Sequence, residues 1–358
     1  MITYFLNKTL YAILTLFGVV TVIFFLFNVL PGDPAQMMMG QNEDSEQLAK
    51  VKAKYGFDKP VLTQYAYYLN DLSPLSFHSN SKEDYTYLSV SKYSAVKLFS
   101  IGNTTTVIKF PYLRESFTKQ GKKVTQVLGE TLPNTFVLAV SAIIIAIIIG
   151  ILLGIVSALY KDRWLDKAIQ VLSTLGMSVP SFFSAILFAW LFGFVLHNYT
   201  NLEMTGSLYE LDDFGEAMHI KWKNLILPAI VLGIRPLAVV IQLMRNSLLE
   251  VFNQDYIRTA RAKGLSEFQI IKRHAVKNAL NPVVTAISGW FASMLAGAVF
   301  VEYIFGWNGL GKEIVNALNT LDLPVIMGSV LVIATLFVMI NILVDLIYVW
   351  LDPKVKLQ

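Results

Sequence analysis

The 358-residue chain contains no cysteine, which excludes a disulfide framework and any thiolate metal ligand or nucleophile. Charged residues are also scarce. They make up 15% of the chain, against roughly 25% in soluble domains, so much of the chain has no water to face. The net charge of +4 is too small to indicate nucleic acid or another acidic partner. The four histidines have no metal-ligand spacing, and no grouping of serine, histidine and acid indicates hydrolysis.

Long apolar runs account for much of the rest of the chain. A helix needs about 20 apolar residues to cross the hydrocarbon core of a bilayer, and six stretches reach this length. They are Thr9–Leu30, Asn134–Tyr160, Ile169–Leu196, Leu225–Met244, Pro282–Phe305 and Pro324–Trp350. Pro180 and Pro236 lie inside the third and fourth stretches, where neighbouring groups can satisfy the freed backbone carbonyls. We therefore predict an all-α polytopic membrane protein with six transmembrane helices.

The first stretch is too long for a cleavable signal peptide, whose apolar region has about 7–15 residues. It also ends in Leu30-Pro31-Gly32-Asp33-Pro34 rather than at a small-residue cleavage site. We interpret residues 1–30 as a retained N-terminal transmembrane helix.

Lysine and arginine predict the orientation, because short cytoplasmic loops carry an excess of both. Thirteen of them lie near the two termini and in the loops 161–168 and 245–281, whereas three lie in the opposite short loops. Both termini and the loop 245–281 are therefore predicted to be cytoplasmic, with residues 31–131 on the other side of the membrane. Residues 132–358 form a predicted five-helix core.

The predicted outer segment has structure of its own. The pattern of Ser45–Tyr55 indicates a short helix that Gly56 stops, and Pro60–Leu72 indicates a second helix. From Tyr85 to Phe110 the chain is rich in Tyr, Val, Thr and Ser with loose alternation, which is typical of short strands. We expect a small extracytoplasmic α/β elaboration between spans one and two.

The long cytoplasmic loop carries the most informative pattern. Asp255–Lys263 is compatible with a helix, and Gly264 can end it. Ser266 followed three residues later by Gln269 resembles a capping box, which predicts a second helix to about Asn278. Two short helices that meet at a glycine form a compact knob, which can transmit force to a partner. A basic amphipathic hairpin that lies on anionic lipid is an equally compatible interpretation.

A resemblance decides between these interpretations. The run Asp255-Tyr256-Ile257-Arg258-Thr259-Ala260-Arg261-Ala262-Lys263-Gly264-Leu265-Ser266 resembles the cytoplasmic signature of binding-protein-dependent ABC importer permeases. That signature reads Glu-Ala-Ala, three residues, then Gly. Arg258 replaces the Glu and Thr259 the first Ala, as in the dipeptide/oligopeptide/nickel branch. The resemblance implies that an ATPase contacts this loop through Asp255, Arg258, Thr259, Ala260, Gly264, Ser266 and Glu267.

Three further stretches resemble the B-type permease subunit of the same family. They are Leu30-Pro31-Gly32-Asp33-Pro34, Gly306-Trp307-Asn308-Gly309-Leu310-Gly311, and Asp345 together with Leu351-Asp352-Pro353. The family motif positions within them are Pro31, Gly32, Asp33, Pro34, Gly309 and Gly311. Residues from about 75 to 109 and from about 197 to 221 match no part of the family pattern, and we interpret both as insertions.

The resemblance implies a type I ABC importer permease fold in the inner membrane. It also implies a heterodimer with a C-type permease subunit, two cytoplasmic ATPase subunits and an extracytoplasmic solute-binding protein. ATP and magnesium would belong to the ATPase subunits, and this chain would supply no catalytic group. Di- or oligopeptides are the expected substrates, with nickel chelates or another small solute as alternatives. An ion-coupled secondary transporter remains a distant alternative, because it would need acidic or histidine relays near the midplane.

Charges inside transmembrane spans are costly and often functional. Arg235 lies near the middle of the fourth span, about 16 Å from its start. It can line the pathway and meet a peptide carboxylate, or it can bind the carbonyls of a neighbouring helix, and both interpretations stay open. Glu302 is expected to be structural. Gly150 and Gly154 predict close packing against another helix.

Overall fold

The structure is a computed structural model that describes residues 2–29, 35–36, 45–82, 84–89, 92–119, 121–212, 215 and 217–351. The motif residues Pro31, Gly32, Asp33 and Pro34 lie outside this part of the chain, as do Asp352 and Pro353 and the side chain of Asp345. What the sequence predicts for them stays a prediction.

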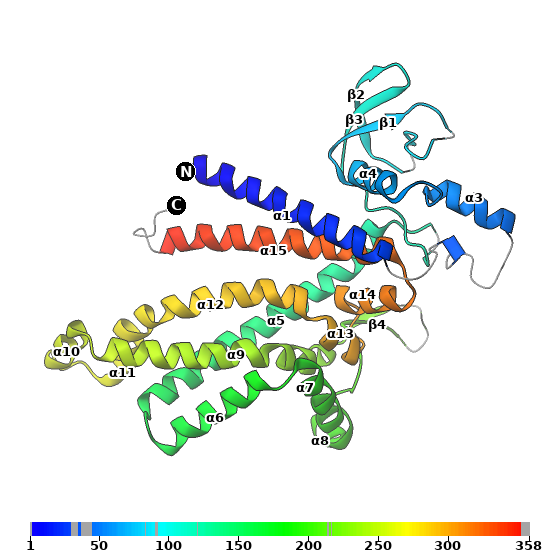
Figure 1. Ribbon diagram of the computed structural model, residues 1–358. Coiled ribbons are helices and arrows are strands. Elements are labelled where there is room, and N and C mark those ends of the chain that lie inside the picture. Colours follow the sequence, from blue (N-terminus) through cyan, green and yellow to red (C-terminus); the bar gives the residue numbers. More distant parts are fainter. Residues whose placement is uncertain are drawn as a thin grey trace. The chain divides into compact units, whose positions relative to one another are not determined.

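Helices dominate the described chain (Figure 1). They are α1 (Ile2–Val29), α3 (Ser45–Tyr55), α4 (Val61–Leu72), α5 (Val124–Leu159), α6 (Trp164–Ser178), α7 (Ser181–Phe188), α8 (His197–Thr200), α9 (Lys223–Phe252), α10 (Asp255–Ala262), α11 (Glu267–Ile270), α12 (Val276–Gly297), α13 (Val299–Phe305), α14 (Leu310–Asn319) and α15 (Leu323–Leu351). Two π-helical turns are η1 (Ala189–Val195) and η2 (Ile271–Ala275). The strands are β1 (Leu75–Ser79), β2 (Ala95–Ile101), β3 (Thr104–Lys109), β4 (Tyr209–Leu211) and β5 (Met218–Ile220).

Four of the described helices are long and apolar enough to cross a membrane by themselves. They are Leu6–Asn28 within α1, all of α5, all of α9 and Leu323–Val344 within α15. Two bent helix pairs bring the number to six when each pair is counted as one span. The six predicted segments are therefore present, but two of them are not continuous helices.

The shape expected for the third span is wrong, because the chain turns by 108° between α6 and the helix that begins with α7. Pro180 is the N-cap of α7 rather than an interior residue of one long helix. A proline disfavours helical backbone at the residue before it, and Val179 is accordingly extended, with φ −78° and ψ 131°. Pro228 and Pro236, by contrast, lie inside α9 without ending it.

The sequence predicts that the second helix of the cytoplasmic loop ends near Asn278. In the structure it continues past this residue. It begins at Glu267 and continues through η2 into α12, with Pro282 in its interior. The fifth span then bends by 56° into α13. The chain therefore leaves the loop on a helix that is already part of the next span.

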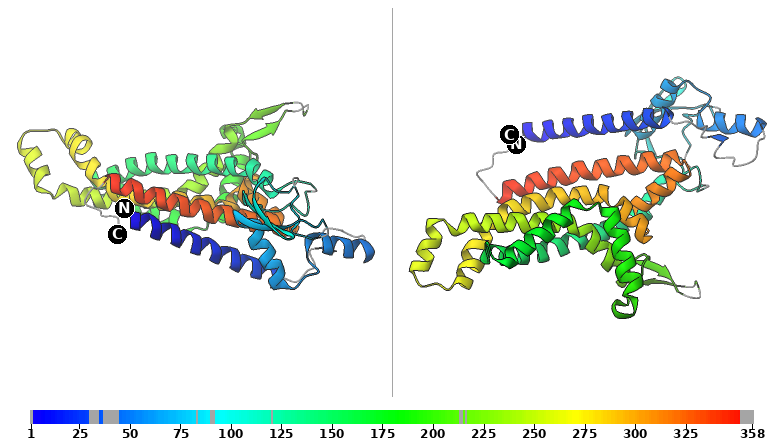
Figure 2. Two further views of the ribbon diagram at one scale, coloured as in Figure 1. Left: turned by 90° about the horizontal axis from the view of Figure 1, so that it is seen from above. Right: turned by 60° about the horizontal axis from the view of Figure 1, so that its bottom comes forward.

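The chain folds into two compact units, and the first contains residues 1–8, 131–313 and 335–358. Within it, α9 packs along α12, as the right-hand view of Figure 2 shows. On another side α9 packs closely on α5, because a Cβ at Gly150 would come within 2.7 Å of Val240 and a Cβ at Gly154 within 2.7 Å of Met244. The prediction that these glycines permit close helix packing is confirmed.

The second unit contains residues 9–130 and 314–334. Here α4 packs on α1: the ring of Tyr68 stacks on Phe24 with centroids 5.7 Å apart, and the hydroxyls of Tyr65 and Thr21 are 2.6 Å apart. The two short helices predicted for this region are confirmed as α3 and α4.

A three-stranded antiparallel sheet follows α4, in the order β1–β3–β2. It begins at Leu75 and ends at Lys109, which are the limits of the stretch that the sequence analysis interprets as an insertion. The strands expected between Tyr85 and Phe110 are confirmed as β2 and β3. The alternating residues that start at Tyr85 do not form a strand. Tyr87 makes only an isolated bridge with Ser79.

Asp71 organises the interior on one side of this sheet. Its carboxylate accepts hydrogen bonds from the hydroxyls of Tyr85 and Tyr93, at 3.2 and 3.0 Å, and from Nε of Arg114 at 2.9 Å. Nζ of Lys109 donates to the backbone carbonyl of Asp71, and burial lowers the pKa of Lys109 to about 8. Polar contacts thus join buried apolar groups such as Val107 and the rings of Tyr93 and Tyr112 in this interior.

Candidate functional site

The α10–α11 hairpin, residues 255–270, contains all seven residues predicted to contact an ATPase. It follows the end of α9 and leads through η2 into α12 (Figure 1). Six of the seven residues are exposed, and Ala260 is buried. The structure thus brings the predicted residues together on one small element.

Gly264 closes α10 with a Schellman motif. Its N–H donates to the carbonyl of Arg261 at 2.9 Å, and the N–H of Leu265 donates to the carbonyl of Ala260 at 3.3 Å. The backbone at Gly264 has φ +78°, a conformation that strains any residue with a side chain. The prediction that Gly264 ends this helix is confirmed. No described atom lies within 4 Å of the place that a Cβ would occupy, so a side chain there would meet strain but no clash.

A capping box opens α11, as the sequence predicts. The hydroxyl of Ser266 accepts the N–H of Gln269 at 3.4 Å, and the side-chain oxygen of Gln269 accepts the N–H of Ser266 at 3.1 Å. Across the turn, Nε of Arg261 donates to Glu267 at 2.8 Å, and its Nη2 donates to the second carboxylate oxygen at 3.3 Å. A backbone motif and a two-pronged ion pair therefore fix the angle between the two helices.

The inner side of the hairpin is apolar and well packed. Ile257 and Ala260 of α10 join a buried cluster with Ile270 of α11 and with residues of α9 and α12. The side-chain amide of Asn278 in α12 donates to the hydroxyl of Tyr256 at 2.8 Å. The hairpin is therefore anchored to both α9 and α12, so a force applied to it reaches two membrane spans.

The outer side of the hairpin is basic and aromatic. Arg258 lies 3.4 Å from Asp255, but both side chains are largely exposed, so this pair contributes little. The hydroxyl of Thr259 donates to the carbonyl of Asp255 at 3.0 Å. Phe268 is 71% exposed. Arg258 and Phe268 can therefore meet a partner without first breaking a strong contact inside the chain.

An ion pair that sequence analysis missed lies where α6 meets α9. Arg245 donates from Nε and Nη2 to the two carboxylate oxygens of Asp166, at 2.7 and 2.6 Å. Asp166 also accepts the hydroxyl of Ser157 at 2.5 Å and the N–H of Asp162 at 2.9 Å, and only 3% of its side chain is exposed. The pair fastens α9 to α6 about two turns before the end of α9. No local signal could find it, because its partners are 79 residues apart.

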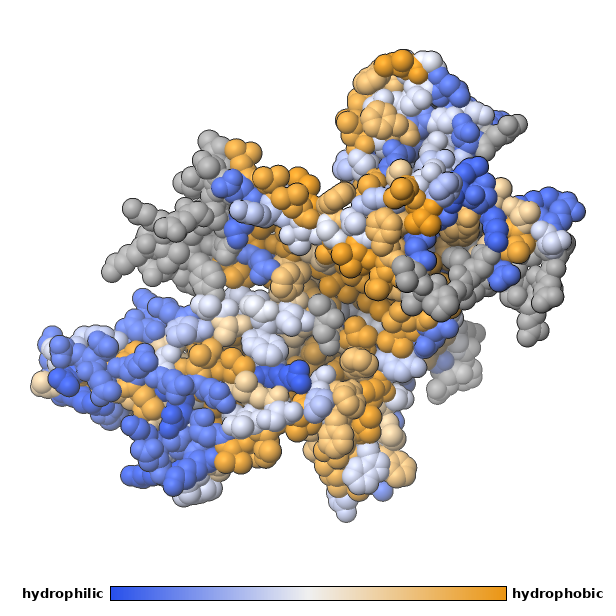
Figure 3. All heavy atoms as spheres, in the orientation of Figure 1, coloured by the Kyte–Doolittle hydropathy of each residue, from blue (hydrophilic) through white to orange (hydrophobic). Residues whose placement is uncertain are grey.

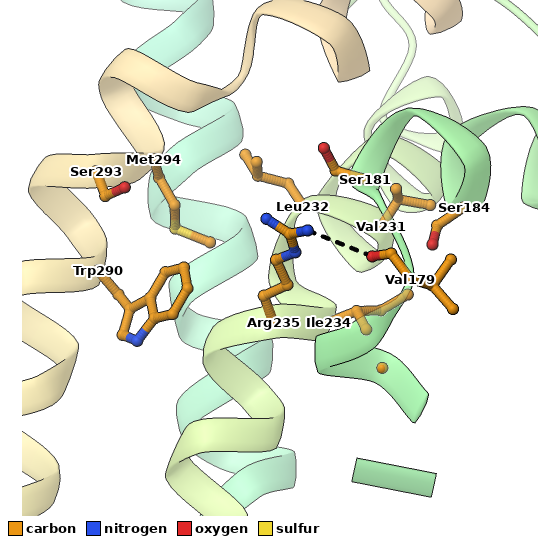
Figure 4. A pocket seen from close by; sticks show the side chains of 11 residues that line it. Val179, Ser181, Ser184, Val231, Leu232, Ile234, Arg235, Trp290, Ser293 and Met294 are labelled. Carbon is orange, nitrogen blue, oxygen red and sulfur yellow. Dashed lines mark hydrogen bonds between the residues drawn. The ribbon is translucent and has the colours of Figure 1, made fainter. Parts of the chain in front are cut away.

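Arg235 lies in a pocket between α7, α9 and α12 (Figure 4). The pocket has a cavity volume of about 90 Å³, which is small beside the roughly 300–1,000 Å³ typical of small-molecule sites. Its polar side chains besides the guanidinium are three serines, and the rest of the wall is apolar. These lining residues are Ser181 and Ser184 from α7, Val231 and Leu232 from α9, and Trp290, Ser293 and Met294 from α12.

The guanidinium of Arg235 makes one weak contact within the described part of the chain. Its Nη2 donates to the carbonyl of Val179 at 3.5 Å, the outer limit for a hydrogen bond (Figure 4). That carbonyl lies at the break between α6 and α7, next to Pro180. The contact has the form expected of a structural role, but it is too long to hold the charge firmly, and the residue is exposed.

The motif residues Gly309 and Gly311 lie against Glu302. The carboxylate of Glu302 is fully buried and accepts the N–H of Gly311 at 2.6 Å and the N–H of Lys312 at 3.2 Å. A Cβ at Gly309 would overlap this carboxylate, and one at Gly311 would overlap the backbone of Val299. The two glycines therefore let the turn close over a buried acid, and Glu302 is structural, as expected.

The same turn is fixed to the part of α5 around Asn134, within the first unit. Trp307 is fully buried, and its indole N–H donates to the carbonyl of Asn134 at 3.0 Å. The side-chain amide of Asn134 donates to the carbonyl of Asn308 at 2.7 Å, and the hydroxyl of Thr135 accepts the N–H of Leu310 at 2.7 Å. The motif thus serves as a structural joint.

The fold defined by these elements is that of ABC importer permeases. Two solved structures of the MetNI methionine ABC transporter, both titled as inward facing, align with TM-scores of 0.52 and 0.50. Each is 15% identical to this chain and covers 64% of it, and the alignments include 98% and 97% of the solved chains. At this identity the likeness concerns the fold alone.

Sequence comparison then gives the family. The family described as "Binding-protein-dependent transport system inner membrane component" matches residues 150–357, and its N-terminal counterpart matches residues 1–81. The chain belongs to this family of inner membrane permease components.

Two relatives carry the name dipeptide transport system permease protein DppB. The protein of Alkalihalophilus pseudofirmus is 32% identical over 369 residues, which covers 99% of this chain and 100% of the relative. The protein of Bacillus subtilis is 32% identical over 344 residues, which covers 96% of this chain and 94% of the relative. The similarity therefore extends over the whole length of the chain.

Proposed function

We propose that this chain is the B-type permease subunit of an ATP-driven importer of di- or oligopeptides and that the α10–α11 hairpin is where an ATPase subunit docks. The names of the full-length relatives support the peptide substrate. The observation that carries the docking role is the construction of the hairpin. Its inner side is anchored to α9 and α12, while its outer side is exposed and basic.

This construction suits the transfer of force. A rigid turn can push or pull on the spans only if it does not deform first, and the Schellman motif, the capping box and the Arg261–Glu267 pair each resist deformation. The Asp166–Arg245 pair continues the rigid path from α9 into α6. In the proposed cycle of alternating access, closure of the ATPases moves the two hairpins and rocks the spans.

Arg235 is proposed to line the pathway. It lines a pocket, it is exposed, and its contact with the Val179 carbonyl is weak enough to be exchanged for a carboxylate. A peptide has a terminal carboxylate, and a guanidinium binds carboxylates in a planar, two-pronged geometry. The serine hydroxyls of the pocket can donate hydrogen bonds to the carbonyls of a peptide backbone and accept hydrogen bonds from its N–H groups.

The proposed assembly contains this chain, a C-type permease subunit, two cytoplasmic ATPase subunits and an extracytoplasmic solute-binding protein. ATP and magnesium belong to the ATPase subunits, so this chain performs no catalysis. Both termini and the hairpin lie in the cytoplasm, and residues 31–131 lie outside the inner membrane. The bias of lysine and arginine supports this orientation.

The experiment is to purify the tagged full chain from its native cells in detergent and to identify what accompanies it. An ATPase and a second permease are expected. After reconstitution, dipeptide with its binding protein should stimulate ATP hydrolysis, whereas a nickel chelate or a sugar should not. A chain that transports peptide without any ATPase would refute the proposal in favour of ion-coupled transport.

A further inference from the structure

The inner face of the β1–β3–β2 sheet is mostly polar, with Val107 as a buried apolar residue, and its outer face is mostly apolar. Ser76 and His78 of β1 and Thr105 and Lys109 of β3 point to the interior around Asp71, and all four are buried. Paired residues on neighbouring strands lie on the same face, so the register fixes the other face as well. Its large side chains are Leu75, Phe77, Val96, Phe99, Ile101 and Ile108, and each is at least half exposed.

This apolar face is continuous across the three strands. Leu75, Ile108 and Val96 form one row, and Phe77 and Phe99 flank Thr106 in the next. Figure 3 shows hydrophobic residues gathered over these strands. None of the strand residues on this face is charged. An interface with a soluble protein is about as polar as the rest of a protein surface, so this composition is unlike one.

The position of the sheet relative to α1 indicates which surroundings cover its apolar face. Both belong to the second unit, and α4 connects them. Tyr65 of α4 meets Thr21, which lies seven residues, or about 10 Å, before the end of the membrane span at Asn28. The sheet begins at Leu75, only three residues after α4 ends. It therefore starts at the depth where headgroups meet the hydrocarbon, near α1, of whose span only 11% is buried within the described chain.

We propose that the apolar face of the β1–β3–β2 sheet rests in the lipid of the leaflet at the Val29 end of α1, which is the outer leaflet in the orientation proposed above. The reversed polarity of the sheet then has a physical reason. Apolar side chains face hydrocarbon, while the polar groups that lipid cannot satisfy are paired among themselves around Asp71. Residues 75–109 act as a second, non-spanning membrane contact of the chain.

Two adjacent positions of β2 offer a matched test. Phe99 lies on the apolar face, and Ser100 lies on the opposite face, where its hydroxyl bonds to Thr105. Both positions are exposed, and the chain has no cysteine of its own. Phe99→Cys and Ser100→Cys can therefore each carry one environment-sensitive fluorophore. The cysteine-free chain, purified with the same subunits, gives the background labelling.

The labelled full chain is placed in vesicles of phosphatidylethanolamine and phosphatidylglycerol. A lipid with a doxyl group near its headgroup should quench the label at residue 99 several-fold more strongly than the label at residue 100, and aqueous iodide should show the reverse order. Equal access of iodide to both labels, with no doxyl quenching of either, would overturn the proposal. Iodide protection at residue 99 that arises only when the binding protein is added would also overturn it and identify a protein-docking surface instead.

Discussion

Replacement of Gly264 by leucine tests how backbone strain in the hairpin affects the docking of an ATPase. A left-handed backbone costs a residue with a side chain roughly 1–2 kcal/mol, which corresponds to about a 5- to 30-fold shift away from the native turn. No clash adds to this cost, because no described atom lies within 4 Å of the Cβ position. Gly264→Leu should therefore leave the spans inserted and the second permease bound, while the turn relaxes and Ser266 moves away from its capping position.

The control for this change is Gly264→Asn. Asparagine adds a side chain of similar length at the same exposed place, but it tolerates the left-handed conformation far better than leucine. The turn should keep its shape, and the path from the ATPase to α9 and α12 should stay rigid. The comparison of the two variants tests strain at nearly constant size.

The assay is the ATPase content and turnover of the purified complex. Gly264→Leu should weaken ATPase docking about 5- to 30-fold, as expected for 1–2 kcal/mol, and should abolish the hydrolysis that substrate stimulates. Gly264→Asn should stay close to the unmodified chain in both. Equal impairment of the two variants would show that size, not backbone strain, matters at this position. Normal docking and turnover in Gly264→Leu would refute the coupling role of the hairpin.

Three further predictions concern the pocket, the orientation and the ion pair. Arg235→Leu should lower peptide uptake about tenfold or more while the complex still assembles, since a hydrogen bond to a charged group contributes ~1.5–3 kcal/mol, and loss of assembly would instead support a structural role. Ser266→Cys should resist an impermeant thiol reagent in intact cells, and its labelling from outside would reverse the proposed topology. Asp166→Ala should destabilise the detergent-purified chain by about 3 kcal/mol in thermal unfolding, because it leaves Arg245 unpaired, and Asp166→Ala combined with Arg245→Leu should recover part of the loss.

Sequence patterns predict the hairpin well because its signals are local. The glycine at 264 and the Ser266–Gln269 capping box act over three or four residues, so their geometry follows from the residues themselves. The Asp166–Arg245 pair depends instead on how α6 docks on α9, and the sequence near either residue contains no signal that predicts it. The same holds for Asn134 and Trp307, which meet only after the chain has folded.

The prolines show why span shape is harder to predict than span position. Pro180 separates two helices, whereas Pro236 lies within α9, although both stand in apolar runs. The surroundings decide: α9 is the most buried of the four continuous spans, and its packing holds the helix together around the missing hydrogen bonds. The sequence likewise does not predict which face of the outer sheet is buried. An alternating pattern of residues indicates that the two faces of a strand differ, but not which of them is covered.

The two ends of the segment that forms the outer sheet lie close together. The N–H of Lys109 donates to the carbonyl of Pro74 at 2.9 Å, and the N–H of Tyr112 donates to the carbonyl of Asp71 at 2.9 Å, so the two ends of residues 75–109 meet. A permease without this segment would need only a short link between them, and α4 and α5 could keep their places. Because its two ends meet, such a closed excursion can vary in length with little effect on the backbone at either end.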